Sequence, residues 1–280
     1  MNKQELLRLL ERLDIRPSVR MGQNFLVDPN LRNALVRDAS PHPGETLLEV
    51  GPGTGILTES LLDAGAHVVA VELDRRLCEY LRERFGQNER FELIEGDACR
   101  LDYGSLMAGR SYRLVANLPY SAGTILIGKL LDLDSPPTEV YVLLQREVAE
   151  RLTAASGGKA YNALSVRAQT LYDTAVLRTV PGRVFYPEPE VASCHVRMVR
   201  LAYPPAAPVR GALATVARAA FSQRRKKLLR VLQNALPQTD WPSAFERLSL
   251  SPDARAETLS RDQFLSLAKT HQQSAQPMVR

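Results

Sequence analysis

The chain has 280 residues, of which 45% are hydrophobic, and it carries a formal net charge of +5. This hydrophobic content is ample for a packed core and excludes a disordered chain, and the length predicts one large domain with a smaller one. No apolar run is long enough for a signal peptide or a membrane-spanning helix, so we expect a cytoplasmic protein.

The cysteines and histidines predict neither a disulfide framework nor a metal site. Cys78, Cys99 and Cys194 are odd in number and contain no C-x-x-C pair, and the four histidines have no metal-ligand spacing. Cys194 and His195 are adjacent in a predicted strand, where neighbouring side chains point to opposite faces. They are therefore not expected to act as a nucleophile and its base.

A glycine-rich turn follows the first strongly predicted strand. Residues 46–50 indicate that strand, Gly51-Pro52-Gly53-Thr54-Gly55 the turn, and residues 56–66 a helix. The glycines let the backbone approach a ligand closely at a helix N-terminus. A dinucleotide-binding loop is the alternative, but Ile56 stands where that fingerprint requires its third glycine.

Carboxylates stand at the ends of the next two predicted strands. Glu72, in strand 67–73, is placed to hold ribose hydroxyls, which suits either NAD or S-adenosylmethionine. Asp97 follows strand 91–95 and could accept a hydrogen bond from the amino group of a cofactor adenine. Each element alone is compatible with an ordinary turn between strand and helix, but their succession favours S-adenosylmethionine.

The tetrapeptide Asn117-Leu118-Pro119-Tyr120 ends the apolar run 114–116 and indicates the chemistry. The lone pair of an adenine N6 is delocalised into the ring, so the amine is a poor nucleophile. The Asn117 side-chain oxygen and the Leu118 carbonyl could accept both N–H hydrogens and draw the nitrogen towards tetrahedral geometry. Pro119 offers no competing N–H, and Tyr120 supplies a flat face for stacking. A purely structural turn is the alternative.

Strands and helices alternate over the first 200 residues, which predicts an α/β fold with a mostly parallel sheet. Later strands are expected at 140–144, 175–180 and 194–201. The last two are separated by a Pro-rich stretch without a helix, and we expect them to be antiparallel.

The charge is unevenly divided along the chain. Residues 1–205 carry a net charge of −2 and residues 206–280 a net charge of +7. The change falls at the Pro-rich segment 203–208, which is typical of a stiff linker, and the apolar pattern beyond it is helical. We therefore predict a catalytic domain at 1–205 and a basic helical domain at 206–280 that recognises RNA by shape and backbone.

A run of four cations, Arg224, Arg225, Lys226 and Lys227, is expected on a helix of the basic domain. We predict that it contacts RNA phosphates, and a solvated helix face is the alternative. Because successive residues point in different directions around a helix, only two or three of the four should reach RNA together.

These motifs resemble those of the bacterial small-subunit ribosomal RNA adenine dimethyltransferases, which are related to the erythromycin-resistance rRNA methyltransferases. The resemblance spans roughly residues 20–270, and segments 223–227 and 255–257 are specific to the housekeeping enzymes. Its motifs are 22–26, 51–55, 72–74, 96–98, 117–120, 144–149, 161, 164–166, 185–189, 221–227 and 255–257. The family pattern Pro-Lys-Val-Asp-Ser is replaced by Pro189-Glu190-Val191-Ala192-Ser193, so no RNA contact is carried over to position 190.

The resemblance implies a class I S-adenosylmethionine methyltransferase fold, Rossmann-like, with a mostly parallel sheet and an antiparallel strand, plus a small C-terminal helical domain. It implies that Asn117, Leu118, Pro119 and Tyr120 are catalytic, and that Phe185 is a second stacking face for the target base. A Phe before a Pro-rich turn can equally be a core residue. The implied cofactor-binding residues are Asn24, Leu26, Gly51, Gly53, Glu72, Asp97, Ala98 and Asn117.

The resemblance further implies an S-adenosylmethionine-dependent enzyme that dimethylates N6 of two adjacent adenosines in a hairpin of small-subunit rRNA. We expect it to act as a monomer on an immature ribosomal subunit, with no membrane or metal partner. Three alternatives remain: a resistance-type enzyme acting on large-subunit rRNA, a ribosome-assembly binding factor with secondary methylation, and a dehydrogenase.

Overall fold

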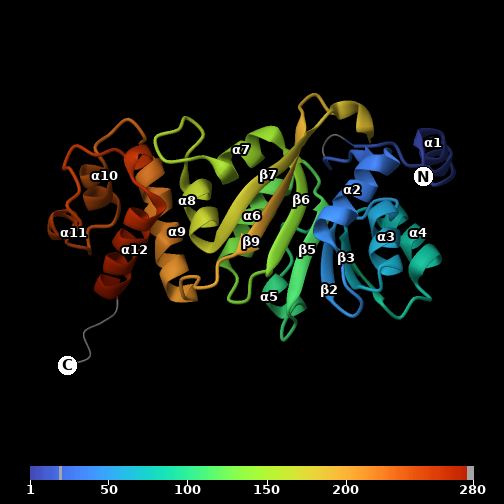
Figure 1. The fold of residues 1–280 in the computed structure, drawn as a ribbon, viewed down its shortest axis with the longest axis horizontal. Helices are drawn as coiled ribbons and strands as arrows, with labels where there is room; N and C mark the ends of the chain where they lie inside the picture. The colour runs from blue at the N-terminus through green and yellow to red at the C-terminus, as the bar shows by residue number, and fades with distance from the viewer. Residues whose placement is uncertain (19–20, 276–280) are drawn as a thin grey trace. The chain divides into compact units, whose positions relative to one another are not determined.

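A computed structural model describes residues 1–18 and 21–275, which form two compact units (Figure 1). Of the described chain, the first unit comprises residues 1–18, 21–130, 137–149 and 175–199. The second comprises residues 131–136, 150–174 and, of the described chain, 200–275. In the described part of the chain, no helix is both long and apolar enough to cross a membrane.

The two units differ from the predicted division at residues 205 and 206. Helix α8 (Ala163–Leu171) precedes that boundary but belongs to the second unit, because it packs on α9 (Ala207–Phe221). Val166 of α8 and Leu213 and Val216 of α9 are buried in one apolar cluster. The change in charge along the chain therefore does not coincide with the change in packing.

The first unit is built on a seven-stranded sheet with the order β4-β3-β2-β5-β6-β9-β7. Neighbouring strands from β4 to β6 are parallel, and β9 is antiparallel to β6, as expected for a mostly parallel sheet with an antiparallel strand. The strands are β2 (Thr46–Val50), β3 (His67–Glu72), β4 (Phe91–Glu95), β5 (Tyr112–Asn117), β6 (Glu139–Gln145), β7 (Tyr172–Val180) and β9 (Ser193–Arg200).

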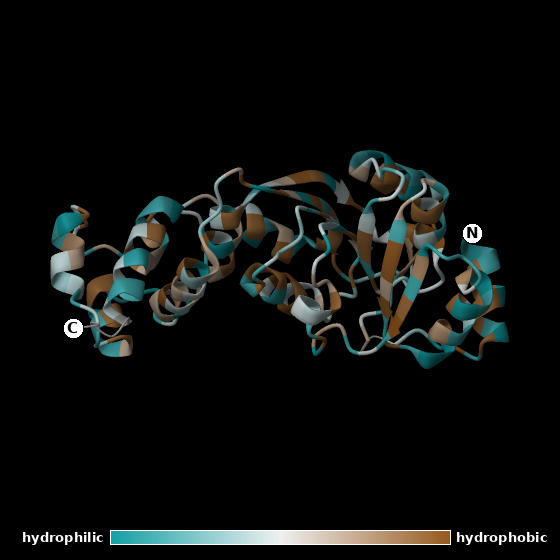
Figure 2. Ribbon diagram, turned by 90° about the horizontal axis from the view of Figure 1, so that it is seen from below, coloured by the Kyte–Doolittle hydropathy of each residue, from teal (hydrophilic) through white to brown (hydrophobic). Residues whose placement is uncertain are grey.

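The central strands are apolar because both faces of the sheet are covered. Val68, Val69, Ala70 and Val71 in β3 are each at most 2% exposed, and Figure 2 shows the central strands mainly in the hydrophobic colour. Helices α3 and α4 pack against β3. The helices that begin in this unit are α1 (Lys3–Arg12), α2 (Pro29–Ala39), α3 (Ile56–Asp63), α4 (Arg75–Phe85), α5 (Tyr103–Leu106), α6 (Gly123–Asp132) and α7 (Arg146–Thr153).

A small two-stranded sheet joins distant parts of the first unit. Strand β1 (Phe25–Leu26) pairs antiparallel with β8 (Phe185–Tyr186), which follows the 3-10 helix η1 (Gly182–Val184). This pairing places the N-terminal segment against a region 160 residues later, with Leu26 opposite Phe185. Both side chains lie in the main apolar core.

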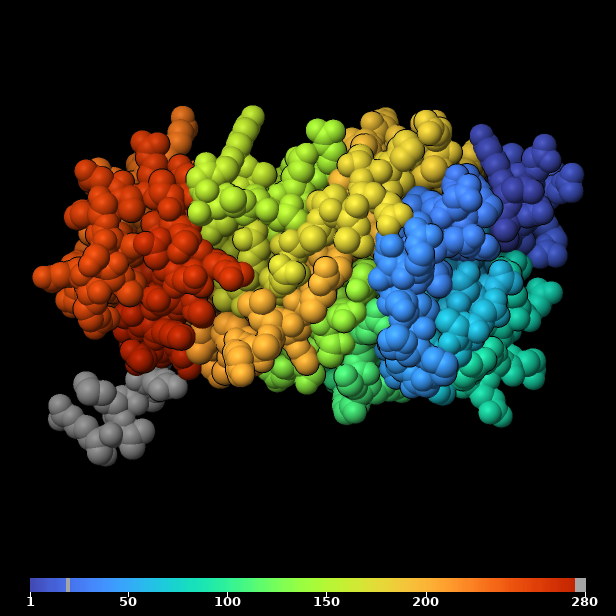
Figure 3. All heavy atoms as spheres, in the orientation of Figure 1, coloured from blue at the N-terminus to red at the C-terminus, as the bar shows by residue number. Residues whose placement is uncertain are grey.

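The second unit has its own apolar core, formed by helices from two parts of the chain. Trp241, Phe264 and Leu228 are fully buried, and the aromatic rings of Phe221 and Phe264 stack at 5.6 Å. Figure 3 shows the lime-green segment that includes α8 lying against the orange and red residues of the later helices. The remaining elements are α10 (Leu228–Ala235), α11 (Trp241–Arg247), η2 (Ala256–Thr258) and α12 (Arg261–Ala275).

The helix predicted for Arg224–Lys227 is wrong. Helix α9 ends at Phe221 and α10 begins at Leu228, so the four cations lie in the turn between them. The Leu228 N–H donates to the Ala254 carbonyl at 2.8 Å rather than to a carbonyl of the preceding residues, so no helical hydrogen bond continues α9 into α10 at this position. Geometric arguments based on one helix face therefore do not apply to this segment.

Candidate active site

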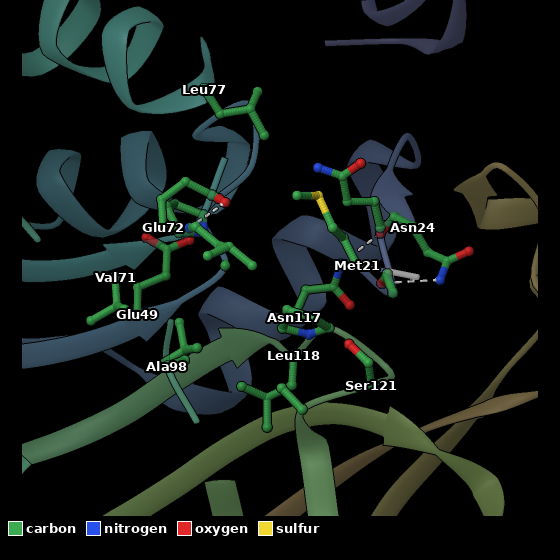
Figure 4. Close-up of a pocket in the computed structure, with 18 of the residues that line it drawn as sticks. Met21, Asn24, Glu49, Val71, Glu72, Leu77, Ala98, Asn117, Leu118 and Ser121 are labelled. Carbon is green, nitrogen blue, oxygen red and sulfur yellow. Dashed lines mark hydrogen bonds between the residues drawn. The ribbon is translucent and has the colours of Figure 1, made fainter. Parts of the chain in front are cut away.

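A pocket of about 650 Å³ lies at the carboxyl ends of β2, β3, β4 and β5 (Figure 4). In a parallel sheet these ends share one edge, where loops from separate parts of the chain converge on a ligand. Among the predicted site residues, those that line the pocket are Asn24, Leu26, Gly51, Glu72, Asp97, Ala98, Asn117, Leu118 and Pro119.

The glycine loop 51–55 lies against the turn 117–120, which follows β5. Gly51 has a φ of 71°, and a Cβ at this position would come within 2.9 Å of the Pro119 ring. Gly53 also has a positive φ, and its N–H donates to Glu72 Oε2 at 3.0 Å. Only glycine permits both the backbone conformation and the close approach, so the loop holds the ends of β2, β3 and β5 in a fixed arrangement.

Glu72 is a buried carboxylate with one hydrogen-bond acceptor site that is still free among its described contacts. Its Oε1 accepts from the N–H groups of Leu73 at 2.8 Å and Asp74 at 3.0 Å, and its Oε2 accepts from Gly53. Since a carboxylate has about four acceptor sites, one remains for a ligand hydroxyl. Burial raises the pKa of Glu72, and the three backbone donors oppose that shift. The arrangement fits a group that binds ribose.

Glu49 is a second buried pocket carboxylate, and the sequence reasoning missed it. It is the last residue but one of β2, is 1% exposed, and its Oε2 accepts from Thr58 Oγ1 at 2.6 Å. Burial raises its pKa to about 8, and repulsion from the nearby Glu72 adds to the effect. The sequence signal for this site residue was a charged side chain within the predicted buried strand 46–50.

The loop after β4 brings Asp97 and Ala98 to the pocket. Asp97 Oδ1 accepts from the Cys99 N–H at 2.8 Å, and Asp97 Oδ2 pairs with Arg100 Nε at 3.3 Å. The Ala98 carbonyl accepts from the hydroxyl of Tyr103 at 3.1 Å. These local contacts orient the loop and leave Asp97 about two-fifths exposed at the pocket, at 39% of its side-chain surface.

Asn117 stands at the end of β5 with its amide oriented by the N-terminal segment. Its Nδ2 donates to the Asn24 carbonyl at 3.0 Å. Its Oδ1 is buried and has no hydrogen-bond partner among the described residues. A buried acceptor without a donor is costly, so this oxygen is placed to accept a hydrogen from a ligand. Figure 4 shows Asn117 beside Leu118 and close to Met21 and Ser121.

The N-terminal segment 22–24 packs against the turn 117–120, a contact that the sequence did not indicate. Gly22 has a φ of 64°, and its carbonyl accepts from the Tyr120 N–H at 3.4 Å. A Cβ on Gly22 would lie 2.7 Å from the Ser121 nitrogen. Gln23, another pocket residue not predicted, donates from Nε2 to Asp74 Oδ2 at 3.2 Å. Residues 22–24 thus contact both Asp74, which follows β3, and the turn 117–120, which follows β5.

Tyr120, Gly53 and Phe185 do not belong to the described pocket lining. The Tyr120 hydroxyl hydrogen-bonds with Ser193 Oγ, and burial raises the pKa of Tyr120. Phe185 is 3% exposed within the main apolar core, so its ring presents no free face for stacking. In this structure Phe185 is a core residue, which was the alternative interpretation of its sequence context. To stack on a target base, as also predicted, its ring would have to leave the core.

The four predicted RNA-binding cations differ in their contacts. Arg224 donates from Nη1 to the Lys159 carbonyl at 2.8 Å, and Lys227 Nζ pairs with Asp253 Oδ1 at 2.5 Å. Arg225 and Lys226 are exposed, and no side-chain partner of either occurs among the described residues. All four lie in the second unit, whereas the pocket lies in the first.

The fold and pocket together are those of a class I methyltransferase with a site for a nucleoside-containing cofactor. The family model of ribosomal RNA adenine dimethylase matches residues 16–273. The chain belongs to the ribosomal RNA adenine dimethylase family. This membership confirms the expected family, the enzyme class and S-adenosylmethionine as cofactor.

Individual relatives agree with the family assignment. The chain is 39% identical over 253 residues to ribosomal RNA small subunit methyltransferase A of Methylococcus capsulatus, covering 90% of this chain and 97% of the relative. It is 42% identical over 249 residues to the protein of the same name from Caulobacter vibrioides, covering 89% and 95%.

Solved structures show the same fold at lower identity. A dimethyladenosine transferase from Plasmodium falciparum has a TM-score of 0.74 at 22% identity, covering 87% of this chain and 95% of that one. The 23S rRNA methyltransferase ErmE has a TM-score of 0.66 at 22% identity, covering 88% and 99%. The predicted methyltransferase fold is therefore confirmed.

Proposed function

We propose that this enzyme transfers methyl groups from S-adenosylmethionine to N6 of two adjacent adenosines in a hairpin of small-subunit rRNA. The relatives named small subunit methyltransferase A support the choice of ribosomal subunit. The two adjacent adenosines and two transfers to each rest on the family resemblance. We further propose that the enzyme acts as a monomer, in the cytoplasm, on an immature ribosomal subunit.

The observation that carries the proposal is the buried Oδ1 of Asn117, which lacks a donor among the described residues. This oxygen would accept one N–H of an extruded adenine amine, and the neighbouring Leu118 carbonyl would accept the other. Because Asn117 Nδ2 is held by Asn24, the amide cannot turn its donor towards the amine without losing that bond. Two acceptors would direct the N6 lone pair at the methyl donor.

The pocket suits S-adenosylmethionine on three counts. The remaining acceptor site of Glu72 would bind ribose, and Asp97 would accept from the adenine amino group. The positive-φ glycines at 51 and 53 would let the backbone approach the ligand. When bound, this cofactor supplies an electrophilic methyl group on a sulfonium. The protein then has to position the amine, and the proton can depart after attack, so no strong base is required of Asn117.

The test is Asn117→Ala in a methylation assay with labelled cofactor. We expect kcat to fall by roughly two to three orders of magnitude, the usual loss for one preorganised transition-state hydrogen bond. Cofactor affinity should fall much less, because Glu72 and the glycine loop remain. Asn30→Ala, an exposed change on α2, is the matched control and should leave kcat unchanged. Methylation by Asn117→Ala at the wild-type rate would refute the role of Asn117.

The substrate is tested by offering wild-type enzyme immature small subunits, large subunits and DNA in parallel, and mapping the modified nucleosides. We expect N6,N6-dimethyladenosine at two adjacent positions in small-subunit rRNA. Modification of large-subunit rRNA alone would instead support the resistance-type alternative, whose fold ErmE shares.

A further inference from the structure

The loop between α7 and α8 is held in place by the cationic turn that follows α9. Arg224 donates from Nη1 to the Lys159 carbonyl at 2.8 Å and from Nη2 to the Gly158 carbonyl at 3.4 Å. These residues are 65 positions apart in the sequence, yet both belong to the second unit. The guanidinium of Arg224 therefore acts as a clamp on this loop, and part of its donor capacity is already used.

A third segment completes the arrangement. The Gly157 N–H donates to the Glu257 carbonyl at 2.6 Å, and the Leu228 N–H donates to the Ala254 carbonyl at 2.8 Å. The loop 154–160 is thus joined to segment 251–257 by a backbone hydrogen bond and to the turn 222–227 by the Arg224 side chain. Leu228, which directly follows the turn, joins it to segment 251–257. We call these three segments the basic junction.

The basic junction carries a strong excess of positive charge. Its cations are Lys159, Arg224, Arg225, Lys226, Lys227 and Arg255, and its carboxylates are Asp253 and Glu257. Lys227 is neutralised by its pair with Asp253. Lys159, Arg225, Lys226 and Arg255 are exposed, and none of these side chains has a partner among the described residues. Exposed cations on three segments that are hydrogen-bonded to one another favour binding of a polyanion with closely spaced charges.

We propose that Lys159 is a further phosphate contact of the RNA-binding surface, alongside Arg225 and Lys226, and that Arg224 is a positioning residue for it. Arg224 holds the loop in the conformation that presents Lys159 to the RNA backbone. The inference rests on the proposed function, because it takes rRNA as the polyanion.

The first test is Lys159→Gln, with rRNA binding measured across a range of salt concentrations. Loss of one phosphate contact should flatten the slope of log K against log salt by roughly 0.7 to 0.9. Lys269→Gln, which removes an exposed lysine from α12 in the same unit, is the matched control and should leave the slope unchanged. Cofactor affinity, measured by calorimetry, should be unchanged in both variants.

The second test separates the clamp from a direct contact. Arg224→Lys keeps the charge but loses the forked donor, so we expect it to flatten the slope about as much as Lys159→Gln. In the double variant the two effects should not add, because both remove the same contact. By contrast, Lys159→Gln and Arg225→Gln should add, because each removes a separate phosphate contact.

The outcomes also separate this inference from the proposed function. If Lys159→Gln and Lys269→Gln both match the wild-type slope while the wild type still methylates rRNA, Lys159 is no RNA contact and the inference is wrong. If Arg224→Lys alone matches the wild type, Arg224 does not position the loop. If the wild type neither binds nor methylates rRNA, the proposed function itself fails.

Discussion

The pH dependence of stability should report the buried carboxyl group of Glu49. Glu49 is 1% exposed inside β2, and burial raises its pKa from 4.5 to about 8. Below pH 4.5 the group is protonated in both the folded and the unfolded chain, so it has no effect. Above that pH the unfolded chain releases the proton while the folded chain retains it, and stability falls until about pH 8.

The magnitude follows from the size of the shift. One pKa unit corresponds to about 1.4 kcal/mol, so the full shift would lower the free energy of unfolding by up to about 5 kcal/mol at pH 8. This is comparable with the whole stability of many domains. Glu49→Gln keeps the shape and an acceptor for the Thr58 hydroxyl, but it cannot ionise. The variant should therefore be more stable than wild type at pH 8 by a few kcal/mol.

Urea unfolding of both proteins at pH 5, 6, 7 and 8 would measure the difference. We expect the advantage of Glu49→Gln to grow steadily from pH 5 and to level off above pH 8. Glu83→Gln, an exposed change on α4, is the control, and its difference from wild type should not vary with pH. A Glu49→Gln difference that stayed constant from pH 5 to 8 would refute the argument that this carboxyl is held neutral by burial.

Two further predictions concern ligand binding. Tyr120→Ala should weaken target binding by about 1–3 kcal/mol, because the stacking face of the ring is lost. Tyr120→Phe and Ser193→Ala each remove the hydrogen bond between these two side chains, so each should raise KM by the same, smaller amount. In the double variant the two increases should not add, because the same bond is lost. Unchanged KM and kcat in Tyr120→Ala would remove this residue from the site. Calorimetry should detect binding of S-adenosylmethionine but not of NAD, and Glu72→Gln should weaken the binding of S-adenosylmethionine. If the wild type instead bound NAD and Glu72→Gln abolished that binding, a dehydrogenase would be favoured.

The local sequence pattern was sufficient to predict the strands of the sheet and the order of the site motifs along the chain. The mainly apolar segment 46–50 became strand β2 with those bounds, because a central strand that is buried on both faces is apolar along most of its length. Segment 91–95 also became a strand with the predicted bounds, although β4 lies at the sheet edge and is only partly buried. The placement of Asp97 and Asn117 at one pocket followed as well, since parallel strands bring their carboxyl ends to the same edge.

Tertiary structure decided the features that depend on contacts between distant segments. Asn117 is oriented by Asn24, 93 residues earlier, and Arg224 reaches back 65 residues to Lys159. The burial of Phe185 depends on its pairing with Leu26, and the position of Arg224 in a turn depends on how α9 and α10 pack. Neither periodicity nor motif spacing encodes these contacts, because they arise only when separate parts of the chain are brought together in the folded units.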